Sequence, residues 1–132
     1  MSTPLALVVD DDPDIRMLVE ISMSRVGGWR VISTDRGRTA IDLAREHRPT
    51  VVLMDVMMPE MDGVEAAGIL LDDPETADIP VVLLTARATV GNEAPPWSEI
   101  AIRGTIAKPF SPRTLAQEVA ALIGWEDAAS TP

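Results

Sequence analysis

Residues 5–12 are Leu-Ala-Leu-Val-Val-Asp-Asp-Asp, an apolar run that ends abruptly in three carboxylates. An unbroken apolar run of this length is typical of a strand buried on both faces of a sheet. Asp12 and Pro13 have the residue types of a helix N-cap and first helical position, where proline's missing N–H does no harm. A buried strand that leads directly into a helix is the first unit of a parallel α/β fold.

The rest of the chain alternates short apolar runs with segments of helical periodicity, without repeats. The apolar runs predict four more strands, at residues 29–33, 51–54, 81–84 and about 105–107. The periodic segments predict helices at residues 13–26, 39–47, about 63–71 and 112–123. We expect Ser111 and Pro112 to cap the last of these helices and Gly124 to end it.

Apolar strands separated by helices indicate a parallel sheet, because parallel strands need crossover connections and are buried on both faces. We therefore predict a flavodoxin-like, doubly wound α/β fold. Its five-stranded parallel sheet should have the order 2-1-3-4-5, with helices on both faces. In such sheets ligands bind at the carboxyl ends of the strands, near the switch in strand order.

The fourth helix of this fold is predicted to be shortened or irregular. Gly91, Pro95 and Pro96 lie where it should form, and an internal proline costs a helix about 3 kcal/mol or more. We expect an irregular loop over about 88–96 and at most a short helix over 97–102. Trp97 beside this loop is either an exposed anchor for a partner or a cover for the core, and Trp125 after the last helix leaves the same choice.

Composition limits the class of protein. A chain of 132 residues with 46% hydrophobic content suits one globular domain, expected at residues 1–124 with a short tail at 125–132 and no output domain. No apolar stretch approaches the ~20 residues of a membrane helix, and no basic, apolar leader is present. The absence of cysteine fits a cytoplasmic location. The net charge of −10 disfavours a nucleic-acid surface.

Four strand ends bring polar side chains to the predicted ligand-binding edge. These are Asp10 and Asp11 after the first strand, Asp55 after the third, Thr85 after the fourth and Lys108, the chain's only lysine, after the last. Each residue alone has an ordinary explanation as a turn former, a strand end or a solvated cation. As an ordered set at four strand ends they predict one site.

Three neighbouring carboxylates raise one another's pKa unless a cation neutralises them. Mg²⁺ suits such a site, because it prefers one or two carboxylates, several waters and a phosphate oxygen. Beside the metal, the Asp55 carboxylate could attack phosphorus and form an aspartyl phosphate. Lys108 and Thr85 would then contact the remaining phosphoryl oxygens by charge and hydrogen bond.

The sequence resembles the response-regulator receiver family, the phosphoacceptors of bacterial two-component signalling. The matching segments are Leu7-Val8-Val9-Asp10-Asp11-Asp12, Asp55-Val56-Met57-Met58-Pro59-Glu60-Met61-Asp62-Gly63, Pro80 through Thr85-Ala86, and Lys108-Pro109-Phe110. They are spread over nearly the whole chain, and their combination is highly specific.

The resemblance implies roles for individual residues. Asp55 would be the phosphoacceptor and, with Asp11, a direct metal ligand. Asp10 would act through a metal-bound water, and Met57 through its backbone carbonyl. Ala86 would be the small residue that leaves a path to the aspartate.

The same resemblance assigns Thr85 and Lys108 to the phosphoryl group and makes a cis Lys108-Pro109 bond common. It implies a phosphohistidine donor on a histidine kinase or histidine phosphotransfer protein. We expect a single-domain response regulator, a monomer or weak dimer without nucleic-acid or membrane contacts. It would not be an enzyme but would assist its own phosphorylation and dephosphorylation, and it would change its binding to an unknown downstream protein.

One position departs from the family pattern. Receivers usually carry Tyr or Phe three residues before the lysine, and its ring turns inward on phosphorylation, whereas this chain has Thr105. In many relatives the fourth helix, last strand and last helix form the output or dimer surface. We therefore expect signalling through a reshaped version of that face.

Two other functions compete with this interpretation. A haloacid-dehalogenase-type phosphatase also begins with an apolar strand and Asp-x-Asp, which would make Asp10 the nucleophile and Asp12 the acid/base. That motif favours Thr or Val at residue 14, where this chain has Asp14, and it leaves the segment 55–63 unexplained. The other rival is a degenerate receiver that only binds partners, although every expected site residue is present.

Overall fold

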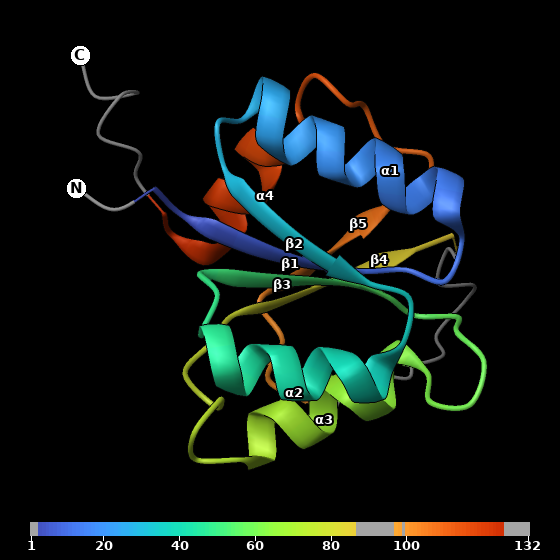
Figure 1. The fold of residues 1–132 in the computed structure, drawn as a ribbon, viewed down its shortest axis with the longest axis vertical. Coiled ribbons are helices and arrows are strands. Elements are labelled where there is room, and N and C mark those ends of the chain that lie inside the picture. The colour runs from blue at the N-terminus through green and yellow to red at the C-terminus, as the bar shows by residue number, and fades with distance from the viewer. Residues whose placement is uncertain (1–2, 87–96, 99, 126–132) are drawn as a thin grey trace.

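The computed structural model describes residues 3–86, 97–98 and 100–125, and they form a five-stranded parallel sheet in the order β2-β1-β3-β4-β5 (Figure 1). Its strands are β1 (Leu5–Val9), β2 (Arg30–Thr34), β3 (Val51–Asp55), β4 (Val81–Thr85) and β5 (Gly104–Ala107). The predicted fold class and strand order are confirmed.

Helices cover both faces of the sheet. They are α1 (Pro13–Ile21), the π-helix η1 (Ser22–Val26) that continues it, α2 (Gly37–His47), α3 (Gly63–Asp72) and α4 (Leu115–Ile123). In Figure 1, α1 and α4 lie above the sheet, and α2 and α3 lie below it. In the described ranges, no helix combines the length and the apolar character needed to cross a bilayer.

The core forms two apolar layers because β1, β3 and β4 are buried along their whole length. Alternate strand residues such as Leu7, Met54 and Leu83 pack against α2 and α3. Their neighbours, such as Val8 and Leu53, pack against α1, η1 and α4. A strand buried on both faces has no polar side, which explains why these strands appear in the sequence as unbroken apolar runs.

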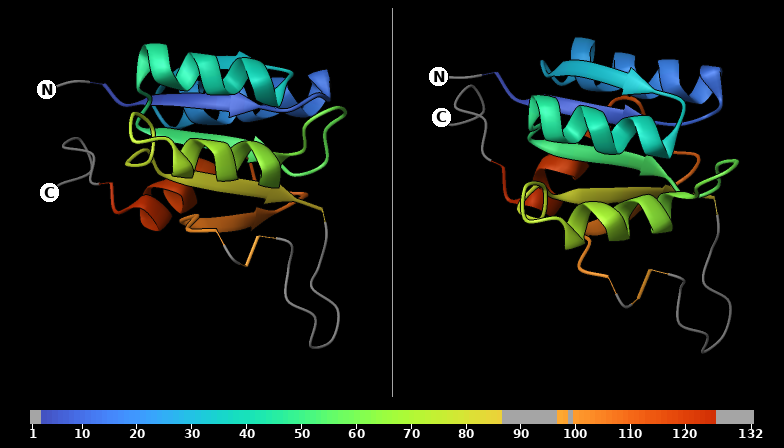
Figure 2. Two further views of the ribbon diagram at one scale, coloured as in Figure 1. Left: turned by 90° about the horizontal axis from the view of Figure 1, so that it is seen from below. Right: turned by 60° about the horizontal axis from the view of Figure 1, so that its bottom comes forward.

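The strands all run in one direction, so their carboxyl ends meet at one edge of the sheet (Figure 2). The register aligns these ends closely. Asp55 pairs with Leu84 across β3 and β4, and Thr85 pairs with Ala107 across β4 and β5. The residues predicted at the carboxyl ends of the strands therefore lie beside one another along one edge of the sheet.

The predicted start of the last helix was wrong. Ser111 does not cap it: residues 112–114 form a turn in which the Ser111 carbonyl accepts from the N–H groups of Thr114 and Leu115. The α-helix begins at Leu115, and its N-cap Thr114 makes no side-chain capping bond. Gly124 ends the helix with a positive φ of 72°, as predicted.

The region of the shortened fourth helix is described only in part. The predicted loop over 88–96 lies outside the described residues. Among residues 97–98 and 100–102, only turn, bend and irregular conformations occur. Trp97 is half-buried and packs against the core layer below the sheet, which supports its role as a cover for the core. Trp125 packs against the other layer, with its ring centroid 6.0 Å from that of Trp29.

Candidate functional site

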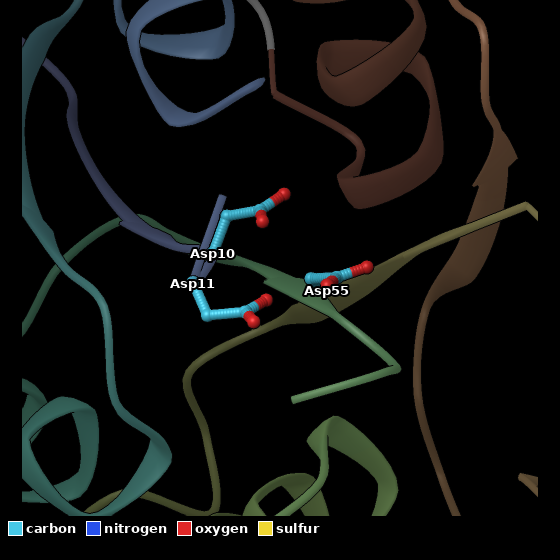
Figure 3. Close-up of side chains that lie close together, drawn as sticks. All are labelled: Asp10, Asp11 and Asp55. Carbon is cyan, nitrogen blue, oxygen red and sulfur yellow. The ribbon is translucent and has the colours of Figure 1, made fainter. Parts of the chain in front are cut away.

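Three carboxylates converge at the carboxyl edge of the sheet. Asp10 and Asp11 follow β1, Asp55 ends β3, and oxygen atoms from all three lie within 4.8 Å of one another. In Figure 3 the three side chains lie close together and extend to the same side of the view. Asp10 and Asp55 are buried and Asp11 is exposed, so the cluster opens to solvent on the Asp11 side.

Lys108 joins the two buried carboxylates. Its Nζ donates to Asp55 Oδ1 at 2.7 Å and to Asp10 Oδ2 at 3.1 Å. The lysine follows β5, and its backbone N–H donates to the Thr85 carbonyl at 2.9 Å. The Lys108-Pro109 peptide is cis. The chain's only lysine therefore lies between two of the three acidic groups.

The site has more acidic groups than basic groups. Burial raises the pKa of the Asp55 carboxyl, and nearby Asp10 and Asp11 raise it further, against the hydrogen bond from Lys108. Burial alone would lower the pKa of Lys108, but its hydrogen bonds to Asp55 and Asp10 outweigh burial and raise it. One ammonium does not neutralise three carboxylates, which favours a further cation.

The donor atoms of this cluster fit a hard divalent cation. They are carboxylate oxygens close enough to share one ion, and the open Asp11 side leaves room for water. Mg²⁺ binds through one or two carboxylates, waters and phosphate oxygens. Neither sulfur nor histidine nitrogen lies among the described residues of the cluster, so softer metals have no preferred ligand there.

Gly63 fixes the loop that follows Asp55. Its N–H donates to the Val56 carbonyl at 2.9 Å, which folds the loop back against the end of β3. A Cβ at Gly63 would lie 2.1 Å from the Asp55 carbonyl oxygen. The sequence predicted a helix from about residue 63, and in the structure the Asp62 side chain caps it by accepting from the Glu65 N–H. The close approach of Gly63 to the Asp55 backbone was missed.

The other predicted site residues lie at the same edge. Thr85 ends β4 and is buried. Ala86 follows it and is exposed. Met57 lies two residues after Asp55 with 67% of its surface exposed, so its side chain does not belong to the core. His47 does not belong to this set. It is the last residue of α2 and comes just before β3 begins, so it lies at the opposite edge of the sheet from the site.

Asp12 has a structural task. Its Oδ1 accepts from the N–H groups of Asp14 and Ile15 at 2.9 and 3.3 Å, which makes it the N-cap of α1 as predicted. The helix cap therefore accounts for Asp12 without the phosphatase alternative, in which it would be the acid/base group.

The sequence profile described as "Response regulator receiver domain" matches residues 6–120. The chain belongs to this family. Its curated relatives include the polar-differentiation response regulator DivK of Brucella anthropi, which is 39% identical over 90 residues, 68% of this chain and 73% of DivK. The parallel sheet and its strand order are therefore those of a receiver.

Solved structures of receivers superpose closely on this chain. The chemotaxis protein CheY4 of Vibrio cholerae has a TM-score of 0.82 and 26% identity, over 92% of this chain and 99% of CheY4. The receiver domain of a Pseudomonas aeruginosa sensor histidine kinase has a TM-score of 0.81 and 26% identity, over 93% and 99% of the two chains. That kinase receiver has a magnesium ion coordinated in its active-site cleft.

Proposed function

We propose that this receiver accepts a phosphoryl group on Asp55 from a phosphohistidine of a histidine kinase or histidine phosphotransfer protein. The observation that carries the proposal is the bridge of Lys108 to Asp55 and Asp10 at 2.7 and 3.1 Å, beside the exposed Asp11. This arrangement holds a nucleophile, a cation and metal-binding oxygens at one edge of the sheet.

The transfer exchanges one bond for another. A carboxylate oxygen of Asp55 forms a bond to phosphorus as the phosphorus–nitrogen bond of the donor breaks, and the imidazole leaves with the electron pair of that bond. Lys108 and Thr85 contact the phosphoryl oxygens, so charge and hydrogen bonds position the group. Ala86 is small and exposed, which keeps the approach to Asp55 open.

Mg²⁺ is the cofactor that we propose for this site. Asp11 and Asp55 would bind it directly, Asp10 through a water molecule and Met57 through its backbone carbonyl. When bound, the ion neutralises charge on the carboxylates and on the phosphoryl oxygens. The magnesium ion in the related kinase receiver supports this assignment. The protein would assist its own phosphorylation and dephosphorylation without being an enzyme that acts on other substrates.

Output would pass through the face made by β5, α4 and the segment before β5. A groove of about 520 Å³ lies there, and its lining includes Thr105, Phe110 and Leu122. Lys108 and Pro109 connect it directly to the phosphoacceptor site. Because threonine replaces the usual aromatic residue at 105, movement of Lys108 on phosphorylation, rather than a turning ring, would change the groove for a downstream protein.

Beryllofluoride, which mimics a phosphoryl group on aspartate, tests where this chemistry occurs. We expect a crystal structure with Mg²⁺ and beryllofluoride to show the beryllium bonded to Asp55. Beryllium on Asp10 would overturn the proposal and restore the phosphatase alternative. In solution with Mg²⁺, the backbone NMR shifts of Thr105 and Phe110 should change when beryllofluoride binds. Unchanged shifts there would exclude this groove as the output surface.

A further inference from the structure

Each polar atom of Asp10 takes part in a hydrogen bond. Its N–H donates to the Thr34 carbonyl at 3.2 Å. Its carboxylate accepts from the Asp12 N–H at 2.9 Å and from Lys108 Nζ at 3.1 Å. Its carbonyl accepts from Arg16 Nη1 at 2.9 Å. Of the two charged donors in this set, Lys108 takes part in the chemistry proposed above and Arg16 does not.

The carbonyl that Arg16 binds belongs to the peptide unit that joins Asp10 to Asp11. A change in the ψ angle of Asp10 would reorient this carbonyl, move the Asp11 Cα and turn the Asp11 carboxylate away from Asp55. Within the described parts of the chain, the exposed Asp11 carboxylate has no side-chain hydrogen-bond partner that could hold it in place. The orientation of Asp11 therefore depends on its backbone.

Arg16 is itself well anchored. It lies in the second turn of α1, where its N–H donates to the Asp12 carbonyl at 2.9 Å, and Asp12 is the N-cap of the same helix. The guanidinium thus reaches back from the helix to the turn that precedes it. A hydrogen bond from a charged donor is stronger than a neutral one and fixes a carbonyl more firmly.

We infer that Arg16 is a positioning residue for metal binding, because it locks the Asp10–Asp11 peptide so that Asp11 faces Asp55. This inference rests on the proposed function, since it concerns the same Mg²⁺ site. A positioning role and a simple effect of charge predict opposite changes in Mg²⁺ affinity when Arg16 is replaced. Loss of a positive charge beside three carboxylates would by itself strengthen Mg²⁺ binding, whereas loss of a positioning bond weakens it.

Isothermal titration of the full chain with Mg²⁺, without any phosphodonor, separates the two effects. We expect Arg16→Met to bind Mg²⁺ about 10-fold more weakly, within the range typical for groups that orient metal ligands. Arg16→Lys keeps a charged donor and should recover part of the affinity. The control is Arg25→Met, an exposed arginine on η1 with the same change in charge, which should leave the affinity unchanged or slightly higher.

Amide NMR gives a second measurement, and a general loss of stability would not produce the same local change in the spectrum. The Asp11 N–H shares the peptide unit with the Asp10 carbonyl, so its nitrogen shift should change in Arg16→Met and not in Arg25→Met. If Arg16→Met does not fold, Arg16→Ala replaces it, because alanine is a strong helix former and likewise removes the donor. Weaker Mg²⁺ binding by that variant supports the inference, and equal or tighter binding overturns it.

The failures of the two proposals are distinguishable. If wild type binds Mg²⁺, Asp55→Asn does not, and Arg16→Met binds as tightly as wild type or more tightly, the role of Arg16 is refuted and the metal site stands. If wild type does not bind Mg²⁺, or Asp55→Asn binds it equally well, the metal site of the proposed function is wrong, and the role of Arg16 is refuted with it.

Discussion

Substitution of Gly63 by alanine tests how closely the loop after β3 must approach Asp55. The added Cβ would lie 2.1 Å from the Asp55 carbonyl oxygen and 2.9 Å from its carbonyl carbon, and real Cβ contacts essentially never fall below 3.0 Å. Both neighbours are backbone atoms, so they have no flexible end that could move aside. The loop or the end of β3 must shift by roughly 1 Å, a misplacement that can lower a rate about 100-fold.

Two effects of Gly63→Ala can be measured separately. We expect the free energy of unfolding, from urea titration, to fall by about 1–3 kcal/mol, as is typical of overpacking. We expect phosphorylation of Asp55 by acetyl phosphate and Mg²⁺, followed by intact mass, to slow about 100-fold. The rate should stay low under conditions in which the variant is fully folded, because the defect lies in the position of Asp55.

Gly68→Ala is the matched control. Gly68 lies in the same helix, and a Cβ there would meet no heavy atom within 4 Å. Because alanine is the better helix former, this variant should be more stable than wild type by about 0.5–1 kcal/mol, with an unchanged phosphorylation rate. A Gly63→Ala protein that matches wild type in both stability and rate would refute the steric reasoning.

Two further predictions concern the charges of the site. Lys108→Met leaves the buried carboxylates of Asp10 and Asp55 without their cation, so the metal-free protein should lose about 3–5 kcal/mol of stability to urea. It should bind Mg²⁺ more tightly than wild type by calorimetry, because the ammonium no longer competes; weaker binding would count against this. Because burial raises the pKa of Asp55 above 3.8, its ionised form destabilises the folded state. In EDTA at neutral pH, Asp55→Asn should therefore be the more stable protein, and its advantage should shrink as the pH falls toward 3.8; an advantage that grows on acidification would contradict the assigned shift.

The sequence predicted the sheet well because its strands carry an unambiguous signal. Leu5–Val9 and Val81–Thr85 are buried on both faces, and a polar residue marks each carboxyl end. The positions of Asp10, Asp55 and Lys108 then follow from topology alone, because parallel strands end at one edge. Their convergence needed no knowledge of side-chain conformation.

Helix ends and bends were predicted less well, because they depend on packing. The prediction of one continuous helix to residue 26 missed the π-helix η1, in which Ser22 and Met23 are buried. A Cβ at Gly27 would collide with the Ala116 side chain of α4, so contact with a distant helix determines how this segment ends. The Ser111-Pro112 pair is likewise compatible with a turn or with a helix cap, so the sequence did not reveal the turn that precedes α4.

Within the site, the contacts that the sequence could not reveal are those made to backbone atoms. Gly63 approaches the Asp55 carbonyl, and Arg16 binds the Asp10 carbonyl. A glycine at a helix start and an arginine on an amphipathic helix have many ordinary explanations. Only the folded chain shows which carbonyl each one meets, and both of these carbonyls belong to aspartates of the site.

The proposed function depends above all on Asp55 as the residue that accepts the phosphoryl group. Intact mass spectrometry after incubation with acetyl phosphate and Mg²⁺ tests this most directly, with Asp55→Asn and a sample in EDTA as controls. We predict that wild type gains the mass of one phosphoryl group and that neither control does. If wild type gains no adduct, or if the adduct persists in Asp55→Asn, then Asp55 is not the phosphoacceptor, and the protein is a receiver that only binds partners or one that uses another residue.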